Sequence, residues 1–489
     1  MRTGPAIVSA SVLLAGVVLL GRLTGFVREM EIAALFGVSA EADFAVILLT
    51  TPDLLVNLLL AGGLGAVLVP EFRPLAGPAR TALLIRVCVI VAAGFCALAT
   101  LIAVVPQVLV APLAPAYSGQ PLARLPFAIM AIAIPLSALS GVTTAFLNAR
   151  DRFLVAGAGT LIFNLTLIVA LFLMAGSGSI LLALAAAISL GAGFRLLSQL
   201  AVSAPLLDRP AAGAAATPTG ELAARFAAAL GATTLMLLVP VVARSTMSFS
   251  GQGGIAAFNY AIKLVELPLG IVISSVTTVA FTRLSDRVAS GRDGEAGELL
   301  AAGTLLVAAA GIAIAAPAIW FSDAIVHLVY GRGRITPEGL VFIAELAAIG
   351  MLTIPLVGVS GMATAMLNAR KRPGIVLRRT LLSLLVLPFA LAPGLILGDA
   401  RLTMTALPVF HLVLAVLTAA AAGLRVPWPM LRPAAIRLAL AGLFMAAVFA
   451  ADHFLGPFPP AARVAMALAA MFVALLICGV RASLARLRL

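Results

Sequence analysis

The sequence is 489 residues long, and 63% of it is hydrophobic while only 10% is charged. Its mean hydropathy is +1.17, which excludes a soluble globular protein, because such a protein needs far more charge to cover its surface. The formal net charge of +13 comes almost wholly from arginine, and in a membrane protein this excess marks cytoplasmic loops rather than a nucleic-acid site. We therefore expect an all-α polytopic membrane protein.

Apolar stretches of roughly 20 residues or more predict fourteen membrane-spanning helices. In chain order they lie near residues 6–27, 42–69, 82–112, 125–148, 154–175, 178–202, 224–247, 255–281, 299–322, 339–368, 375–397, 402–423, 435–455 and 461–480. Two of them, 42–69 and 339–368, are long enough to be tilted or broken. The three cysteines lie in apolar spans and indicate neither a disulfide framework nor a metal site.

One stretch of this series occurs twice. Residues 134–152 read IPLSALSGVTTAFLNARDR and residues 354–372 read IPLVGVSGMATAMLNARKR, which are identical at 12 of 19 positions with a constant offset of 220 residues. The matches include Asn, Arg and Pro, which are scarce here, so an internal duplication is favoured over coincidence. Each copy predicts an apolar helix that ends in a short basic loop.

The duplication divides the chain into two related halves. The first six spans predict an N-terminal half at residues 1–203, and the next six predict a C-terminal half at residues 223–424. Between them, residues 204–222 are rich in Pro, Ala and Gly and predict a cytoplasmic linker. Residues 425–489 hold two extra helices and a basic cytoplasmic tail.

The basic residues of the loops predict the orientation of the chain. With both termini in the cytoplasm, the inner loops carry most of the arginines, whereas the outer loops hold only Arg28, Arg124, Arg332, Arg334 and Arg401. Both copies of the repeat then end on the cytoplasmic side. The halves are therefore expected to form a parallel repeat about an axis along the membrane normal.

Ionisable side chains inside spans cost about 2.5–3.5 kcal/mol each on insertion scales and are candidates for function. Arg195 and Arg244 are expected near membrane interfaces. Asp53 follows Pro52 in mid-span, where the proline also frees a backbone carbonyl. The candidates for a substrate site are Arg22, Arg28, Asp43, Asp53, Lys263 and Glu266.

Several candidates also have a purely structural interpretation. Arg22 can extend to the outer interface and pair with Glu29, and Asp43 can lie in that interface. Lys263 and Glu266, spaced i, i+3, can neutralise each other on one helix face. Against this, the cations gather on the leading helices of each half, which are rich in Pro and Gly. Bendable helices with buried cations predict a central cavity that binds an anion such as phosphate.

Several short boxes resemble one family. GRLTGFVREMEIAALFG at residues 21–37, ADF at 42–44, PDLL at 52–55 and VLVPEF at 67–72 look like the opening of the MurJ/MviN family. LNARDRF at 147–153 and KLVELPLG at 263–270 are similar to later boxes of that family. Its members are lipid II flippases of the multidrug/oligosaccharidyl-lipid/polysaccharide exporter superfamily. The resemblance implies fourteen spans, with the last two bordering a groove for a lipid tail.

The resemblance also implies roles for individual residues. Arg22 and Arg28 match family arginines that face the cavity, and Asp43 matches the family's acidic residue. Lys263 stands where the family has an essential arginine, and Glu266 matches its glutamate. The chain departs from the family in four places. Val56 and Asn57 replace a pair of arginines, and the segment from Ala61 to Leu64 lacks a glutamate. Glu29 and Ile262 each stand where the family has an aspartate.

We expect a flippase rather than an enzyme, carrying lipid II across the bacterial cytoplasmic membrane by alternating access. Arg22, Arg28 and Lys263 would bind its pyrophosphate from both halves. No nucleotide-binding motif occurs, so no cofactor is expected, and the membrane potential or a coupled ion would supply energy. The expected partners are the lipid-linked saccharide and membrane lipids, with no nucleic acid, and the protein is expected to be a monomer.

Three alternatives remain open. A flippase for another polyprenyl-pyrophosphate-linked saccharide, of the exopolysaccharide or O-antigen type, fits the departures from the family. A cation-coupled drug exporter would use Asp43, Asp53 and Glu266 to bind protons or sodium. A membrane enzyme would need catalytic groups on the outer loops, where the sequence offers Tyr117, Asp323, His327 and Glu338.

Overall fold

A computed structural model describes residues 4–57, 64–119, 123–174, 179–210, 219–456 and 458–479, and within these ranges it contains helices and no strand. The first ten α-helices are α1 (Gly4–Phe36), α2 (Ala40–Asn57), α3 (Leu64–Phe72), α4 (Gly77–Val104), α5 (Gln107–Leu113), α6 (Arg124–Ala131), α7 (Ala133–Ala149), α8 (Phe153–Met174), α9 (Ile180–Ser203) and α10 (Thr219–Thr246). The next eleven are α11 (Gly254–Pro268), α12 (Ser274–Ala289), α13 (Asp293–Trp320), α14 (Ser322–Tyr330), α15 (Pro337–Met351), α16 (Thr353–Ala369), α17 (Pro373–Leu384), α18 (Leu387–Leu397), α19 (Ala400–Ala422), α20 (Trp428–Leu455) and α21 (Pro460–Ile477).

The helices match the predicted spans one by one. Among the described residues, ten segments, single helices or directly joined pairs, are long and apolar enough to cross a membrane. The other four predicted spans correspond to α1, to α2 with α3, to α10, and to α11 with α12, all of which carry ionisable side chains. The long stretch at 339–368 is broken at Leu352 into α15 and α16. In the stretch at 42–69, residues 58–63 lie outside the described ranges.

Several predicted boundaries were wrong, and local sequence explains two of them. α1 continues to Phe36 instead of ending near residue 27, so Arg28 lies inside a helix and not in an outer loop. The oppositely charged Arg28 and Glu29 pair with each other, which lets the helix continue through them. The stretch at 82–112 is not one helix. α4 ends before Pro106, because proline restricts the residue that precedes it, and the short α5 follows.

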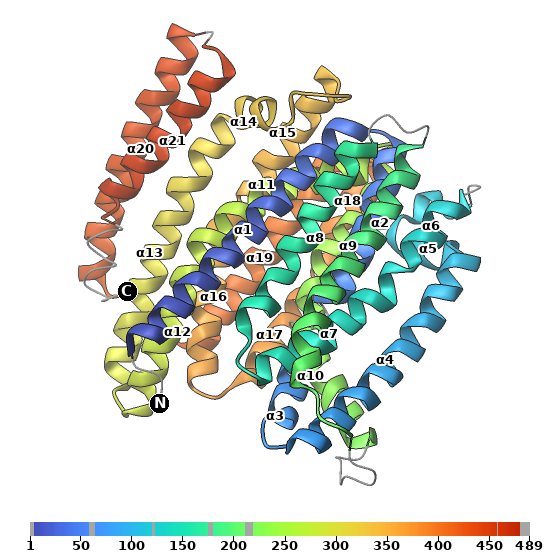
Figure 1. Cartoon of the computed structure of the whole chain (residues 1–489). Coiled ribbons are helices and arrows are strands. Elements are labelled where there is room, and N and C mark those ends of the chain that lie inside the picture. Colours follow the sequence, from blue (N-terminus) through green and yellow to red (C-terminus); the bar gives the residue numbers. More distant parts are fainter. Residues whose placement is uncertain are drawn as a thin grey trace. The chain divides into compact units, whose positions relative to one another are not determined.

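The chain divides into two compact units, Met1–Val241 and Val242–Leu489. In unit 1, α8 packs against both α1 and α9, and α7 packs against α9 and α4, as Figure 1 shows in blue and green. In unit 2, α20 and α21 pack together beside α13. The predicted halves at 1–203 and 223–424 and the C-terminal segment at 425–489 stay predictions, and residues 211–218 of the predicted linker lie outside the described ranges.

The two copies of the repeat fold alike. α7 and α16 each begin after a one-residue break in a longer helix and end at equivalent residues. At the first end, Asp151 N–H donates to Asn148 O and Arg152 N–H donates to Leu147 O; Lys371 and Arg372 donate to Asn368 and Leu367 in the second. This is a Schellman pattern, which satisfies the last carbonyls of a helix. The duplicated sequence therefore specifies a duplicated local structure.

In unit 2, α11 leads into α12 through one turn of π-helix, Leu269–Ile273. This turn directly follows Pro268, which has no N–H to donate and whose ring would clash with a regular preceding turn. A π turn absorbs such a defect without ending the helix. The span that carries Lys263 and Glu266 is therefore irregular just after these residues.

Candidate functional site

The guanidinium of Arg28 is the centre of a buried polar cluster in unit 1. Its Nη1 donates to Asn164 Oδ1 at 2.8 Å. Its Nη2 donates to Glu29 Oε1 at 2.8 Å and to Asp53 Oδ2 at 3.4 Å. Arg28 is only 5% exposed, and its guanidinium also lies over the ring of Phe163. We call Arg28, Glu29, Asp53 and Asn164 the Arg28 cluster.

Asn164 positions Arg28 from α8. Its Oδ1 accepts a hydrogen bond from Arg28, and its Nδ2 donates one to Gly21 O at 2.9 Å. Both polar atoms of the amide therefore bind α8 to α1. A Cβ at Gly25 would lie 3.0 Å from Asn164 Nδ2, so this glycine makes room for the amide. Asn164 was not predicted as a site residue from the sequence, although an amide side chain in the apolar span at 154–175 was the available signal.

Asp53 is the most exposed member of the Arg28 cluster's three charged residues. Its side chain is 42% exposed, whereas those of Arg28 and Glu29 are 6% and 2% exposed. It sits in α2 directly after Pro52, and its contact with Arg28 is the longest of the cluster. Of the two carboxylates that compensate Arg28, Asp53 is therefore the one with room to move.

Arg195 is a second buried cation of the same unit. It lies in α9, which packs against α2 and α8, and it is only 6% exposed. Asp53, on the neighbouring helix α2, is the carboxylate whose charge bears on Arg195. The sequence predicts that Arg195 lies near a membrane interface, which stays a prediction; in the structure Arg195 is buried among the helices of unit 1.

Asp43 and Arg22 lie outside the Arg28 cluster. Asp43 is completely buried and accepts a hydrogen bond of 2.6 Å from the hydroxyl of Tyr117. This bond ties α2 to the short 3-10 turn Pro115–Tyr117 that follows α5. Arg22 is exposed on α1. Because six residues separate it from Arg28, it faces another side of that helix.

Lys263 and Glu266 form an ion pair on α11 in unit 2. Lys263 Nζ lies 2.8 Å from Glu266 Oε2, and the side chains are 28% and 52% exposed. The i, i+3 pairing expected from the sequence is therefore present, and both groups remain accessible. The side chains of Val56 and Ala61, where the chain departs from the MurJ/MviN pattern, lie outside the part that the structure describes.

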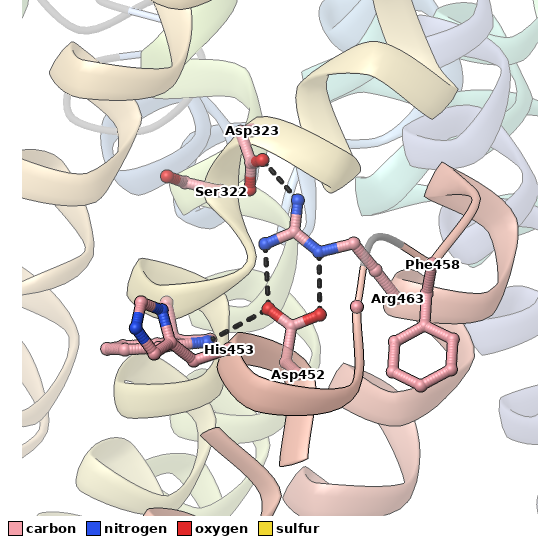
Figure 2. A pocket seen from close by; sticks show the side chains of 8 residues that line it. Ser322, Asp323, Asp452, His453, Phe458 and Arg463 are labelled. Carbon is pink, nitrogen blue, oxygen red and sulfur yellow. Dashed lines mark hydrogen bonds and ion pairs between the residues drawn. The ribbon is translucent and has the colours of Figure 1, made fainter. Parts of the chain in front are cut away.

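A further polar cluster holds the last two helices in unit 2. The guanidinium of Arg463 makes two hydrogen bonds of 2.9 Å with the carboxylate of Asp452 and also contacts Asp323, as Figure 2 shows. Trp320 Nε1 donates to Asp452 at 3.2 Å. We call Trp320, Asp323, Asp452 and Arg463 the C-terminal clasp; together with His453 and Phe458 they line a hollow of about 650 Å³.

Neither cluster is suited to a metal ion. Within the described ranges, no group of three or more His, Cys, Asp or Glu side chains is placed to hold one. The Arg28 cluster instead offers a buried guanidinium whose one accessible partner is a carboxylate. Such a guanidinium can bind an anion in pairs of hydrogen bonds once the carboxylate yields its place.

Comparison with known proteins shows the family of the chain. The sequence model of the family described as "Lipid II flippase MurJ" matches residues 32–486. A "Probable lipid II flippase MurJ" of Rhizobium meliloti (strain 1021) is 28% identical over 125 residues. That alignment covers 26% of this chain and spans only 23% of the relative's length.

Two solved structures show the fold. The chain is similar to "Lipid II flippase MurJ, inward closed conformation", with a TM-score of 0.81 and 18% identity over 95% of this chain and 98% of that one. It is less similar to an inward-facing MATE transporter of the MOP superfamily, with a TM-score of 0.65 and 14% identity over 84% and 97% of the two chains. The expected all-α fold of about fourteen membrane-spanning helices is confirmed.

The family match covers most of the sequence, and the MurJ fold covers nearly all of it. The chain therefore belongs to the MurJ family of lipid II flippases.

Proposed function

We propose that this chain carries lipid II, the lipid-linked precursor of peptidoglycan, across the bacterial cytoplasmic membrane. The observation that carries the proposal is the match of residues 32–486 to the lipid II flippase family. The MurJ fold supports it, since the chain covers 98% of that solved structure. Transport of a bound lipid needs no covalent chemistry, so the protein is proposed to be a transporter and not an enzyme.

The Arg28 cluster suits the charged part of such a substrate. A pyrophosphate presents several anionic oxygens, and a guanidinium binds them with paired, charge-assisted hydrogen bonds. Arg28 is held by Glu29 and Asn164, so its orientation is fixed before substrate arrives. Arg22 and Lys263 remain proposed contributors to binding. So do Asp43, through its hydrogen bond with Tyr117, and Glu266, through its ion pair with Lys263.

The proposed transport cycle is alternating access, in which the protein opens to one side of the membrane at a time. The membrane potential or a coupled ion is proposed as the energy source, without an organic cofactor or a nucleic-acid partner. We further propose a monomer in the cytoplasmic membrane with both termini in the cytoplasm. The proline in α2 and the π turn after α11 provide bendable points within individual helices.

A second candidate is transport of a different polyprenyl-pyrophosphate-linked saccharide. Val56, Asn57 and Ala61 stand where the MurJ/MviN pattern has charged residues. Fewer charges around a headgroup change which sugars and peptides can be bound, while the pyrophosphate, common to both substrates, still needs a cation. The two candidates therefore share the role of Arg28 and differ only in the headgroup.

Complementation tests the proposal. The chain is expressed in cells depleted of their own lipid II flippase, with membrane levels measured. We expect growth with the native chain and with Arg209→Ala, which removes an exposed arginine, and loss of growth with Arg28→Ala and Lys263→Ala. No growth with the native chain at normal membrane levels would favour the second candidate. Growth with all variants would show that Arg28 and Lys263 are not part of the site.

A further inference from the structure

Arg195 is a buried cation that forms no ion pair with the described part of the chain. Among the described residues no carboxylate lies within ion-pair distance of it, and its buried Nε has no hydrogen-bond partner. Arg195 is only 6% exposed, and a buried cation without an ion-pair partner is costly, particularly inside a membrane protein. Such a group points to a partner that reaches it in another state of the protein.

The surroundings of Arg195 are built to hold it. A Cβ at Gly159 of α8 would lie 2.9 Å from Arg195 Nε, so a larger residue at this position would have to displace the guanidinium. Gln199, one turn further along α9, is already satisfied: its Oε1 accepts from Ser140 and Thr143, and its Nε2 donates to Thr144. The amide of Gln199 therefore has its own partners, and an acidic group could still pair with Arg195.

Asp53 is the carboxylate that can supply this partner. Its helix α2 packs against α9, which carries Arg195, so its negative charge favours the charged form of Arg195. Its bond to Arg28 is long, at 3.4 Å, and its side chain is 42% exposed. Pro52 leaves the preceding turn of α2 without one hydrogen bond, which eases a small movement of Asp53.

We propose that Asp53 is an exchangeable counter-ion that moves from Arg28 to Arg195 when an anionic phosphate group binds Arg28. The inference rests on the proposed function in taking that group to be the pyrophosphate of a lipid-linked substrate. Without the exchange, an entering anion would meet two carboxylates around one guanidinium. With the exchange, Asp53 neutralises the buried Arg195, and Arg28 keeps only Glu29 and Asn164 as partners, which leaves its open edge for the phosphate oxygens.

The exchange makes the effect of each substitution depend on the other residue. In Arg195→Gln the carboxylate has no place to go and stays on Arg28, so anion binding weakens. In Asp53→Asn the competing charge is gone, so anion binding is at least as strong as in the native chain. In the double variant no carboxylate competes for Arg28, so the loss of Arg195 should not weaken anion binding further. We call Arg195 a positioning residue, because it acts through Asp53 and not on the substrate.

The test measures binding of inorganic pyrophosphate to the purified full-length protein by isothermal titration calorimetry. We expect Arg195→Gln to weaken binding at least tenfold, Asp53→Asn to bind as tightly as the native chain or tighter, and the double variant to bind within threefold of Asp53→Asn. Arg209→Gln is the control for the loss of one arginine, and Arg28→Gln should abolish binding. A double variant as weak as Arg195→Gln alone would overturn the proposal, because a purely structural defect is not repaired by removing a second charge.

Asp53→Asn carries the test by itself if Arg195→Gln does not fold, since weaker pyrophosphate binding in Asp53→Asn would also overturn the exchange. So would the absence of binding in both the native chain and Asp53→Asn. The result is separable from the proposed function. The expected binding pattern together with failed complementation would support the exchange and reject lipid II as the substrate. Successful complementation, together with additive effects of the two substitutions on pyrophosphate binding, would support lipid II as the substrate and reject the exchange.

Discussion

Lys371 is held in a backbone conformation that lysine rarely adopts. In the described part of the chain, Lys371 and Asp151 are the two non-glycine residues with positive φ, at 58° and 57°. Both occupy the residue after the helix cap in the repeat, a position that glycine fills after α19, where Gly423 has a φ of 72°. A Cβ in this region costs roughly 1 kcal/mol, and aspartate tolerates it better than lysine does.

We therefore predict that Lys371→Gly stabilises the protein by about 0.5–1 kcal/mol and Asp151→Gly by less. Thermal unfolding of the purified protein in detergent measures the change. Lys371→Ala is the matched control, because it removes the same charge but keeps the Cβ and should bring no gain. Equal midpoints for the alanine and glycine variants would show that the backbone at Lys371 is not strained.

The sequence identified only half of the Arg28 cluster. Arg28 and Asp53 were predicted because charges inside apolar spans are conspicuous, but their contact was not, since it joins helices 25 residues apart in the chain. Asn164 was missed because a neutral amide in a span is a weak signal until its two partners are known. The burial of Arg195 depends on Gly159 of a neighbouring helix, and no periodicity within α9 reveals which residue faces that glycine.

At the scale of elements, apolar length predicted where spans occur but not where helices end or break. Helix ends are decided by single residues, such as Pro106 after α4 and Gly37 after α1. Packing between elements was also hidden. In each unit a tyrosine from the short segment after the third span bonds to the second span: Tyr117 donates to Asp43, and Tyr330 donates to the backbone carbonyl of Tyr260. The two tyrosine contacts are similar, but the sequences around them do not repeat, so the sequence did not predict them.

The C-terminal clasp leads to a prediction for α20 and α21. Along their length these helices meet α13 through an apolar cluster that includes Ala313, Ala441 and Ala474, so Arg463 supplies a charged contact at one end. Arg463→Ala would leave Asp452, whose side chain is 7% exposed, without its cation. We expect a loss of about 2 kcal/mol in the docking of α20 and α21.

Hydrogen–deuterium exchange measures this loss directly, since about 2 kcal/mol corresponds to roughly 30-fold faster exchange in α20 and α21. Arg463→Lys should be intermediate, because an ammonium keeps the charge but not the two parallel hydrogen bonds. Arg432→Ala, at an exposed position near the other end of α20, is the control. Equal exchange in Arg463→Ala and Arg432→Ala would mean that the clasp does not hold the helices.

At the scale of the whole molecule, the duplication is visible in both sequence and structure. α7 and α16 share their length, their preceding break and their closing hydrogen bonds. Duplication of an even number of spans gives two halves with the same direction through the membrane. The orientation of the chain is then set by its arginine-rich loops, and one measured loop in each half is enough to test it.

Ser118 and Ser290 provide that test. Both are exposed and lie in loops, the first between α5 and α6 and the second between α12 and α13. The positive-inside rule places Ser118 outside and Ser290 in the cytoplasm, because arginines flank the second loop and are scarce around the first. With the native cysteines replaced by alanine, Ser118→Cys should react with a membrane-impermeant maleimide in intact cells whose outer envelope is permeable. Ser290→Cys should react only after the cytoplasmic membrane is opened. The reverse pattern would invert the topology, and labelling of both in intact cells would contradict the number of spans between them.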